Sequence, residues 1–307
     1  MFGLQKIIPV NSEYNFLGLR KNFLIFSSLI ITTSVILLLF IGLNLGIDFK
    51  GGTLIEIRTD NSNIDISQIR KSLLKMDLGD VVVKKFGKEN DYLVKIEINN
   101  TNDENFIKSI NDQLTSDLGS VVNFRRVENV GPKVSSELLK SGLLAISLSL
   151  AAMLFYIWIR FEWQFSLAAI IALLHDVIIT VGIFSFLSYE INLSIVAAVL
   201  TIVGYSMNDT VVIFDRIREN LKKYSKMHII EIANTSTNET LSRTLITSIT
   251  TLLALLSIYI LGGAILKGFS FAMIVGVIFG TYSSIFVAAP ILTYANVTQK
   301  TVLKEDN

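Results

Sequence analysis

The residues most able to do chemistry in this sequence are ionisable side chains inside long apolar runs. The clearest is Asp209, close to the end of the apolar run 193–214. A carboxylate inside hydrocarbon costs several kcal/mol unless it meets protein, water or a positive charge. Polar residues share its helix face at the spacing i, i+4, i+7, i+8: Thr201, Tyr205, Asn208 and Asp209. We therefore expect this face to look into a helix bundle, and we interpret Asp209 as functional rather than as a helix-end residue at the interface.

A complementary set of polar residues begins just before the apolar run 245–266. It repeats the same spacing: Arg243, Thr247, Thr250 and Thr251. If Asp209 and Arg243 meet, the arginine keeps the aspartate ionised, and protonation of Asp209 would free the arginine. Such a pair is a two-state electrostatic switch driven by a proton.

A second ionisable site, His175-Asp176, falls near the middle of the apolar run 165–187. Neighbouring residues on a helix point about 100° apart, so the two side chains need not pair directly. Two interpretations stay open. The site either ties its helix to a neighbour through a hydrogen bond, or it belongs to a proton path together with Asn208 and Thr247.

Two enzyme interpretations fit the sequence poorly. Gly204-Tyr-Ser-Met-Asn208 nearly matches the G-x-S-x-G elbow, but that motif needs a strand-turn-helix, and this run is a continuous apolar helix. Asp176 and Asp209 could form the carboxylate pair of an intramembrane aspartyl protease. At 1.5 Å per residue their depths in the membrane differ by about 10 Å, so this remains a weak alternative. We expect no catalytic residue.

Composition excludes several classes of protein and site. The chain has 307 residues, of which 51% are apolar and 17% charged, as expected for a protein that crosses a membrane several times. The net charge of +1 gives no reason to expect a nucleic-acid partner. There is no cysteine, and His175 and His228 are far apart, so neither a disulfide nor a metal site is expected.

Six apolar runs predict six membrane-spanning helices. They cover 23–43, 143–159, 165–187, 193–214, 245–266 and 269–294. Lysine and arginine gather in the segments that this arrangement places on one side, including Lys6, Lys21, Arg160, Arg216 and Lys300. Because such residues stay in the cytoplasm, we expect both termini there.

The insert 46–137 has the pattern of a soluble domain. Strands are predicted at 53–59, 80–86, 92–98 and 121–127, and helices at 65–76 and 103–118. Two strand-helix-strand halves in tandem predict a ferredoxin-like α+β domain between helices one and two. Gly51-Gly52 is interpreted as a tight turn.

The expected domain organisation has four parts. These are the N-terminus with helix one (1–45), the α+β domain (46–137), helices two to six (138–296) and a cytoplasmic tail (297–307). Within the third part, 215–244 is interpreted as an amphipathic helix on the membrane surface. Its Arg216 and Arg218 are expected to contact anionic lipids.

Several motifs together resemble the SecF branch of the SecD/SecF family of bacterial protein-export membrane proteins. They are Gly46-Ile-Asp-Phe-Lys-Gly-Gly-Thr53, Leu174-His-Asp176, Gly204-Tyr-Ser-Met-Asn-Asp209, Phe214-Asp-Arg-Ile-Arg-Glu-Asn220 and Arg243-Thr-Leu-Ile-Thr247. The resemblance extends over nearly the whole chain and keeps the order of the motifs.

The resemblance implies a proton-driven machine in the bacterial inner membrane, related to the resistance-nodulation-division exporters. It implies that motion of periplasmic domains promotes translocation of secreted polypeptides, with SecD as obligate partner, the SecYEG channel, and YajC as a further candidate. Asp209 and Arg243 would be the proton-coupling residues, protons the coupling ion, and no cofactor would be needed. The alternative outside this family is a half-size proton-driven exporter of lipid or drug, which would need an apolar portal in its outer domain.

Overall fold

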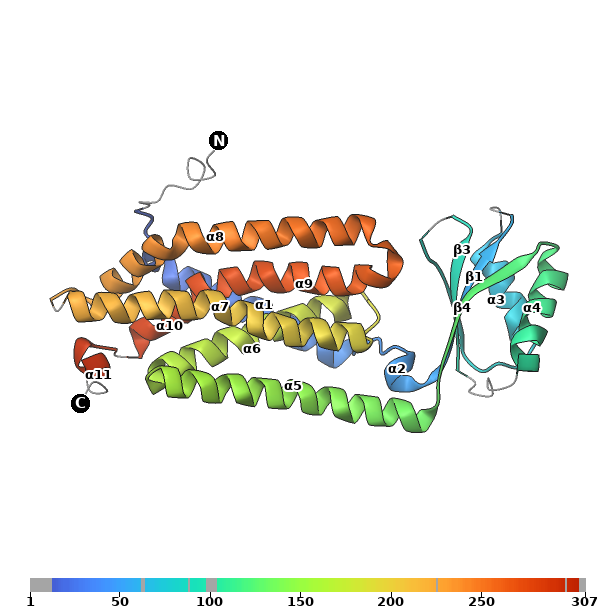
Figure 1. Cartoon of the computed structure of the whole chain (residues 1–307), viewed down its shortest axis with the longest axis horizontal. Helices are drawn as coiled ribbons and strands as arrows, with labels where there is room; N and C mark the ends of the chain where they lie inside the picture. Colours follow the sequence, from blue (N-terminus) through green and yellow to red (C-terminus); the bar gives the residue numbers. More distant parts are fainter. Residues whose placement is uncertain are drawn as a thin grey trace. The chain divides into compact units, whose positions relative to one another are not determined.

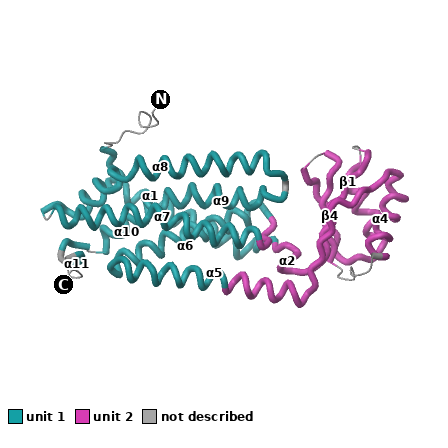
Figure 2. The backbone as a smooth tube through the Cα atoms, viewed as in Figure 1, with its two compact units in different colours: residues 1–44, 145–189, 194–307 teal, residues 45–144, 190–193 magenta. Residues whose placement is uncertain are grey.

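The computed structural model describes residues 13–61, 64–87, 89–97, 104–224, 226–295 and 297–303. Lys6, and the ends of the predicted N-terminal part and tail, lie outside these residues. The chain divides into two compact units, shown in Figure 2 and described separately below. Unit 2 comprises 45–144 and 190–193, and unit 1 comprises 1–44, 145–189 and 194–307.

Unit 2 holds a four-stranded antiparallel sheet with two helices on one face (Figure 1). The strands are β1 (Gly52–Thr59), β2 (Val81–Lys85), β3 (Asp91–Ile96) and β4 (Val122–Val130), in the spatial order β2-β3-β1-β4. Helices α3 (Ile66–Leu74) and α4 (Glu104–Leu118) follow β1 and β3. This order is that of the ferredoxin-like sandwich, so the predicted fold of the insert is confirmed.

Buried and more exposed residues alternate along β1, so the side chains of one face of the sheet form a core under the helices. Ile55 and Ile57 are fully buried, and they pack with Ile69 and Leu73 from α3 in one contiguous core. Helix α3 begins where Asp65 and Gln68 form a capping box, which satisfies the first free N–H groups of the helix. The capping box at the start of α3 and the buried residues of β1 and α3 therefore favour the same fold.

Gly52 is required where the chain enters β1. Its φ is +119°, in the region that only glycine adopts readily, and a Cβ at this position would lie 2.6 Å from the carbonyl oxygen of Ile96 on β3. Gly51, with φ +79°, precedes it after a short helix, α2 (Ile47–Lys50). The tight turn predicted from Gly51-Gly52 is therefore present, whereas α2 was not predicted.

Six helices or helical stretches are long and apolar enough to cross a membrane, among the residues that the structure describes. They are α1 (Arg20–Phe40), α5 (Pro132–Arg160), α6 (Trp163–Phe186), α7 (Leu193–Lys223), α8 (Ile229–Leu261) and the stretch of α9 (Gly263–Ser283), a π-helical segment (Ser284–Ala288) and α10 (Ala289–Tyr294). A short helix, α11 (Gln299–Leu303), follows. The predicted number of spans is confirmed.

Two boundaries differ from the sequence-based expectation. The segment 215–244 is not a separate surface helix, because α7 continues to Lys223 and α8 already begins at Ile229. Helix α5 begins at Pro132, eleven residues before the predicted start of its apolar run at Leu143. In both cases the helix also includes the polar stretch next to its apolar run, because backbone hydrogen bonding within a helix does not depend on the hydropathy of the side chains.

Small residues on α9 allow it to approach α7 closely. A Cβ at Gly276 would lie 2.3 Å from the side chain of Ile202, and one at Gly280 would lie 3.0 Å from that of Ser206. This is the small-xxx-small packing common between membrane helices. It brings the backbone of α9 against the middle of α7, where the polar residues described next lie.

Candidate functional site

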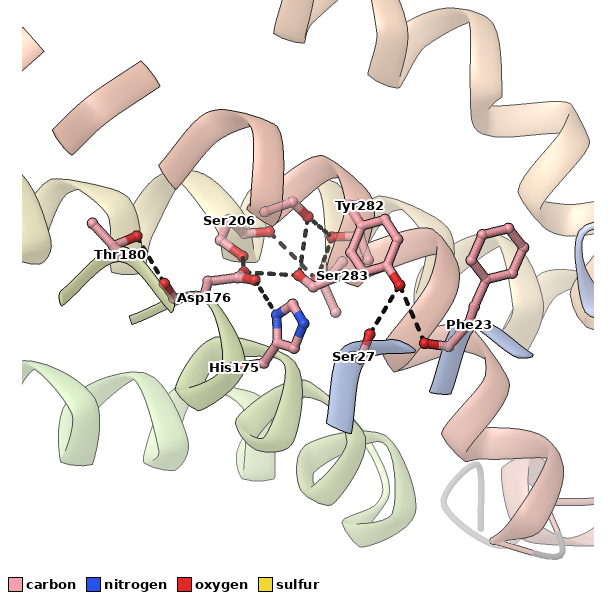
Figure 3. A network of polar contacts seen from close by, with 11 residues as sticks. Phe23, Ser27, His175, Asp176, Thr180, Ser206, Tyr282 and Ser283 are labelled. Carbon is pink, nitrogen blue, oxygen red and sulfur yellow. Dashed lines mark hydrogen bonds and ion pairs between the residues drawn. The ribbon is translucent and has the colours of Figure 1, made fainter. Parts of the chain in front are cut away.

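Asp176 is the most completely buried carboxylate in the described part of unit 1. It lies on α6 with 0% of its surface exposed. Its Oδ2 accepts hydrogen bonds from Ser206 Oγ on α7 at 2.6 Å and from Ser283 Oγ on α9 at 2.7 Å. Figure 3 shows both hydroxyls turned toward the carboxylate. One aspartate therefore ties three helices together.

His175 pairs with Asp176, although the two are adjacent on the helix. Its Nδ1 lies 2.8 Å from Asp176 Oδ1, and the imidazole is buried. The sequence analysis did not predict this contact, because neighbouring side chains on a helix point about 100° apart. It forms because the imidazole and carboxylate, although attached about 100° apart, can bend toward each other.

An aromatic side chain covers one face of the His175 ring. The ring stacks on Tyr282 of α9, with centroids 5.9 Å apart and an interplanar angle of 19°. The Tyr282 hydroxyl lies 2.9 Å from Ser27 Oγ and donates to the carbonyl of Phe23 at 3.2 Å, both on α1 (Figure 3). The polar cluster thus reaches from α1 to α7.

Asp209 forms a second centre, about one turn after Ser206 on α7. It is 3% exposed, and Ser248 Oγ of α8 lies 3.5 Å from its Oδ2. Ser248 in turn shares a 2.6 Å hydrogen bond with Thr281 of α9. The carboxylate therefore faces into the bundle, as the sequence predicts, and its surroundings are hydroxyl groups.

Arg243 does not bond to Asp209 in this structure. The arginine is exposed on α8 and forms no ion pair with any described residue. It is still close enough to attract the Asp209 carboxylate. Instead of the expected contact, the two residues interact here only by long-range attraction. A direct ion pair would require the Arg243 side chain, or α7 and α8, to move.

The other polar residues on the predicted face of α7 turn away from the bundle. Thr201 and Asn208 are exposed, whereas Asp209 is buried. Eight residues rotate a helix by about 80° beyond two full turns, so Asp209 sits at the edge of the arc that begins at Thr201. The expectation that the whole face looks inward is therefore wrong, except for Asp209 and the half-buried Tyr205.

The complementary polar residues on α8 also differ in exposure. Thr250 is exposed with Arg243, and Thr247 is half-buried. The Thr247 hydroxyl donates to the carbonyls of Arg243 and Thr244 in its own helix, and its carbonyl accepts from Tyr205 Oη at 3.3 Å. Thr247 therefore links α8 to α7 through its backbone, and its hydroxyl does not reach Asp209.

The two aspartates do not form a catalytic pair. Asp176 bonds to Ser206, Ser283 and His175, whereas Asp209 has Ser248 as its neighbour. An aspartyl protease needs two carboxyls that share one proton directly. The described residues also contain no cluster of histidine, cysteine and carboxylate side chains that could hold a metal.

Sequence reasoning missed the hydroxyl residues that surround both carboxylates. These are Ser206, Ser248, Thr281 and Ser283. A signal did exist, because hydroxyls on the interior of apolar helices commonly mark helix contacts in membranes. Thr281, Ser283 and Ser284 lie within four residues of one another in an otherwise apolar stretch.

Arg216 and Arg218 are engaged within the protein rather than free for lipid. Arg216 pairs with Glu219 and Glu239, each at 2.6 Å. Arg218 pairs with Glu162, whose side chain is only 5% exposed, and lies over the ring of Phe161. The expectation that both arginines serve chiefly as lipid contacts is not supported by these bonds.

Comparison with known proteins relates the chain to protein export. The family model described as "Protein export membrane protein SecD/SecF, C-terminal" matches residues 107–298, and the "SecD/SecF GG Motif" model matches 36–62. A protein translocase subunit SecF from Rickettsia rickettsii is 45% identical over 294 residues, which cover 94% of each chain. One from Rickettsia bellii is 44% identical over 298 residues, 95% of this chain and 96% of its own.

Two solved structures share the fold. SecDF from Thermus thermophilus, described as a translocon-associated membrane protein, matches with a TM-score of 0.84 and 34% identity over 94% of this chain. SecDF in a super-membrane-facing form matches with a TM-score of 0.70 and 32% identity over 97% of this chain. The chain spans only 39% and 40% of those two SecDF chains.

Proposed function

Because this chain belongs to the SecD/SecF family of protein export membrane proteins, we propose that it is a SecF-type subunit whose work is driven by protons. In this role it transports protein and catalyses no reaction. The coupling ion is the proton, bound at Asp209, and no cofactor takes part.

The observation that carries the proposal is the position of Asp209. It is buried inside a bundle of membrane-spanning helices, near Ser248 and Thr281 but without a bonded positive partner among the described residues. A carboxylate in such a place gains much from binding a proton, because its charged form is poorly solvated. Hydroxyl groups can bond to it in either state, since each can donate or accept.

Arg243 supplies the second half of the switch. While Asp209 is ionised, the arginine is attracted to it. Protonation removes that attraction, so the electrostatic interaction between α7 and α8 changes each time Asp209 binds or releases a proton. Moving one charge through a potential of 100 mV supplies about 2.3 kcal/mol, and several protons together could drive movement of the outer domain.

SecD is the partner that this arrangement requires. Polar residues that face away from the bundle form a row on α7 and α8: Thr201, Asn208, Arg243 and Thr250. The hydroxyls of Thr201 and Thr250 donate to carbonyls of their own helices, but lipid cannot satisfy Asn208 and Arg243, so we infer that a second membrane protein covers this surface. The matched SecDF chains are more than twice as long, which agrees with a partner that supplies the remainder.

The wider assembly is also part of the proposal. The subunit would work in the bacterial inner membrane with both termini in the cytoplasm, and with the insert in the periplasm. There SecD and this subunit would promote release of secreted polypeptides from the SecYEG channel, with YajC and anionic lipids as further contacts. Both alternatives, a half-size exporter and a protease, lack support from the relatives, which are named as translocase subunits.

Photo-crosslinking tests the partner directly. A photoreactive amino acid at position 208, which is exposed on α7, should give an adduct with SecD in membranes that contain both subunits. The matched control is Leu148, an exposed apolar residue on α5, which should react only with lipid. Adducts with lipid alone at both positions would contradict the proposed interface, and capture of an unrelated exporter component would favour the alternative function.

A further inference from the structure

We propose that Asn234 and Asn238 are positioning residues that set the rotation of α8 about its own axis. They do so by binding residues 13–19, the segment before α1, which we call the N-terminal strap. Figure 1 shows the start of the described chain beside α8. The two side-chain amides hold the strap so that α8 presents Ser248 to the Asp209 carboxylate. This inference deepens the proposed function, on which the role of that carboxylate rests.

The strap is held through its backbone. Asn238 and Tyr14 form a reciprocal pair: Asn238 Oδ1 accepts from the Tyr14 N–H at 2.9 Å, and Asn238 Nδ2 donates to the Tyr14 carbonyl at 2.8 Å. Asn234 Nδ2 donates to the same carbonyl at 3.0 Å, and its Oδ1 accepts from the Leu17 N–H at 3.2 Å. Two successive turns of α8 are therefore joined to one short stretch of backbone by side chains that both donate and accept.

The strap is itself anchored to the rest of the bundle. Leu17 is fully buried in the core of unit 1, and the ring of Phe16 meets that of Phe286 edge-on, with centroids 5.8 Å apart. The strap continues directly into α1, which packs closely on α6: a Cβ at Gly182 would lie 2.4 Å from the side chain of Ser34. The amides thus connect α8 to a part of the bundle that is fixed by other contacts.

The face of α8 that holds the strap is also the face that meets Asp209. Asn234, Leu241 and Ser248 are spaced seven residues apart, so they lie within about 40° of one another around the helix. Leu241, between the other two, is buried in the core of unit 1. Because a helix is a rigid element, the strap bonds near its beginning fix the direction in which Ser248 points.

Arg243 lies on the opposite side of α8. It is five residues before Ser248, about 140° around the helix, and its side chain is exposed. A turn of α8 that carried Arg243 toward Asp209 would carry Ser248 away. The same turn would pull the two asparagines from the strap. The strap bonds therefore oppose a direct pair of Asp209 and Arg243, and they favour the arrangement in this structure.

Cysteine cross-linking of the full chain in membranes measures the rotation directly, since the sequence contains no cysteine. Ser248 Oγ and Thr281 Oγ1 of α9 lie 2.6 Å apart, so Ser248→Cys with Thr281→Cys should form a disulfide under mild oxidation. Thr210→Cys with Ser284→Cys is the matched pair, because those hydroxyls lie 2.7 Å apart and neither belongs to α8. The assay needs neither export nor a proton gradient, so its outcome is separate from that of the proposed function.

The strap offers a variant that leaves both asparagines in place. Tyr14→Pro removes the N–H that Asn238 accepts, whereas Tyr14→Ala keeps it and removes a ring that is 56% exposed. Tyr14→Pro should slow the 248–281 cross-link, and Tyr14→Ala should not. Equal slowing by the two variants would show that the ring holds α8 and would count against the backbone bonds.

We expect Asn234→Ala combined with Asn238→Ala to slow the 248–281 cross-link about fivefold or more, because a disulfide needs Cβ atoms about 3.5–4.5 Å apart. The 210–284 cross-link should keep its wild-type rate. Asn22→Ala, at an exposed asparagine of α1, should leave both rates unchanged. A wild-type rate for 248–281 in the double variant would overturn the proposal. Slowing of both pairs together would also overturn it, since the amides would then serve folding in general and not the rotation of α8.

Discussion

Asp48 Oδ2 accepts a 2.9 Å hydrogen bond from the backbone N–H of Leu193, a residue 145 positions later in the chain. Leu193 is the first residue of α7, so its N–H has no acceptor within the helix. Close by, Gly46 N–H donates to the carbonyl of Ile191 at 2.9 Å. The motif that begins the insert therefore also caps the helix that carries Asp209.

Removal of this cap should loosen the start of α7. Asp48→Ala should cost about 0.5–2 kcal/mol, as for other capping residues, whereas Asp48→Asn keeps an acceptor and should cost less. Hydrogen exchange of the amides at 193–196 measures the effect. Asp112→Ala, at an exposed position on α4, is the control. Equal exchange in Asp48→Ala and the control would show that Asp48 does not hold this helix.

The fragment 46–137 should fold by itself. Its core is contiguous and includes the fully buried Ile55, Ile57, Ile69 and Leu73. We expect circular dichroism of an α+β protein and a cooperative thermal transition. Gly52→Ala should abolish or strongly weaken that transition, because of its φ and its contact with Ile96, whereas Gly131→Ala, with open space around it, should not. A random-coil spectrum of the wild-type fragment would rule out an independent domain.

The stability of this fragment should depend on pH through Asp117. The ammonium of Lys75, bonded to it at 2.9 Å, is the largest of several hydrogen-bond donors, with Ser72 and Gln113, that together lower the pKa of the Asp117 carboxyl to about 2. In the unfolded chain an aspartate has a pKa of about 3.9. The contribution is thus complete above about pH 4 and is lost as the pH falls toward 2.

Asp117→Asn should therefore unfold at a slightly lower temperature than wild type at pH 7, and the difference should vanish near pH 2. The effect is small because Lys75 is exposed to water. Asp112→Asn is the matched substitution on the same helix and should show no such dependence. A constant difference between Asp117→Asn and wild type from pH 7 to pH 2 would exclude the ion pair.

Arg218 and Arg216 should differ in their effects on stability. Arg218→Ala leaves the buried carboxylate of Glu162 without its partner, which typically costs about 3–5 kcal/mol. Arg216→Ala removes exposed pairs worth about 0–1 kcal/mol. Thermal unfolding of the purified protein distinguishes them, and Glu162→Gln should recover part of the loss in Arg218→Ala. Equal, small effects would instead favour lipid contact as the role of both.

Much of the fold follows from local patterns in the sequence. The strands and helices of the insert alternate with clear periods, so their bounds were predicted within a few residues. Each apolar run is long enough to span a membrane, so the number of spans was predicted as well. The ends of α7 and α8 were not, because the polar residues after Phe214 are compatible with a continuing helix as well as with a surface helix.

The candidate site was only partly predictable for a related reason. Asp209, His175 and Asp176 are conspicuous because charge is rare in apolar runs. Serine and threonine are common in such runs, so nothing in the spacing singled out Ser206 or Ser283 as partners. Which side of α7 looks inward is decided by packing against α9, where Gly276 and Gly280 admit the helix closely.

If protonation of Asp209 drives export, release of a secreted protein in a proton gradient should depend on this carboxylate. Vesicles with SecD and SecYEG are loaded with a secreted protein held at a late stage, and its release is followed with and without a proton gradient. Asp209→Asn and Arg243→Met should assemble normally and yet lose the acceleration by the gradient, and the double variant should be no worse than either. Asp215→Asn, an exposed carboxylate on the same helix, should behave like wild type. Acceleration of Asp209→Asn by the gradient to the wild-type extent would contradict the account.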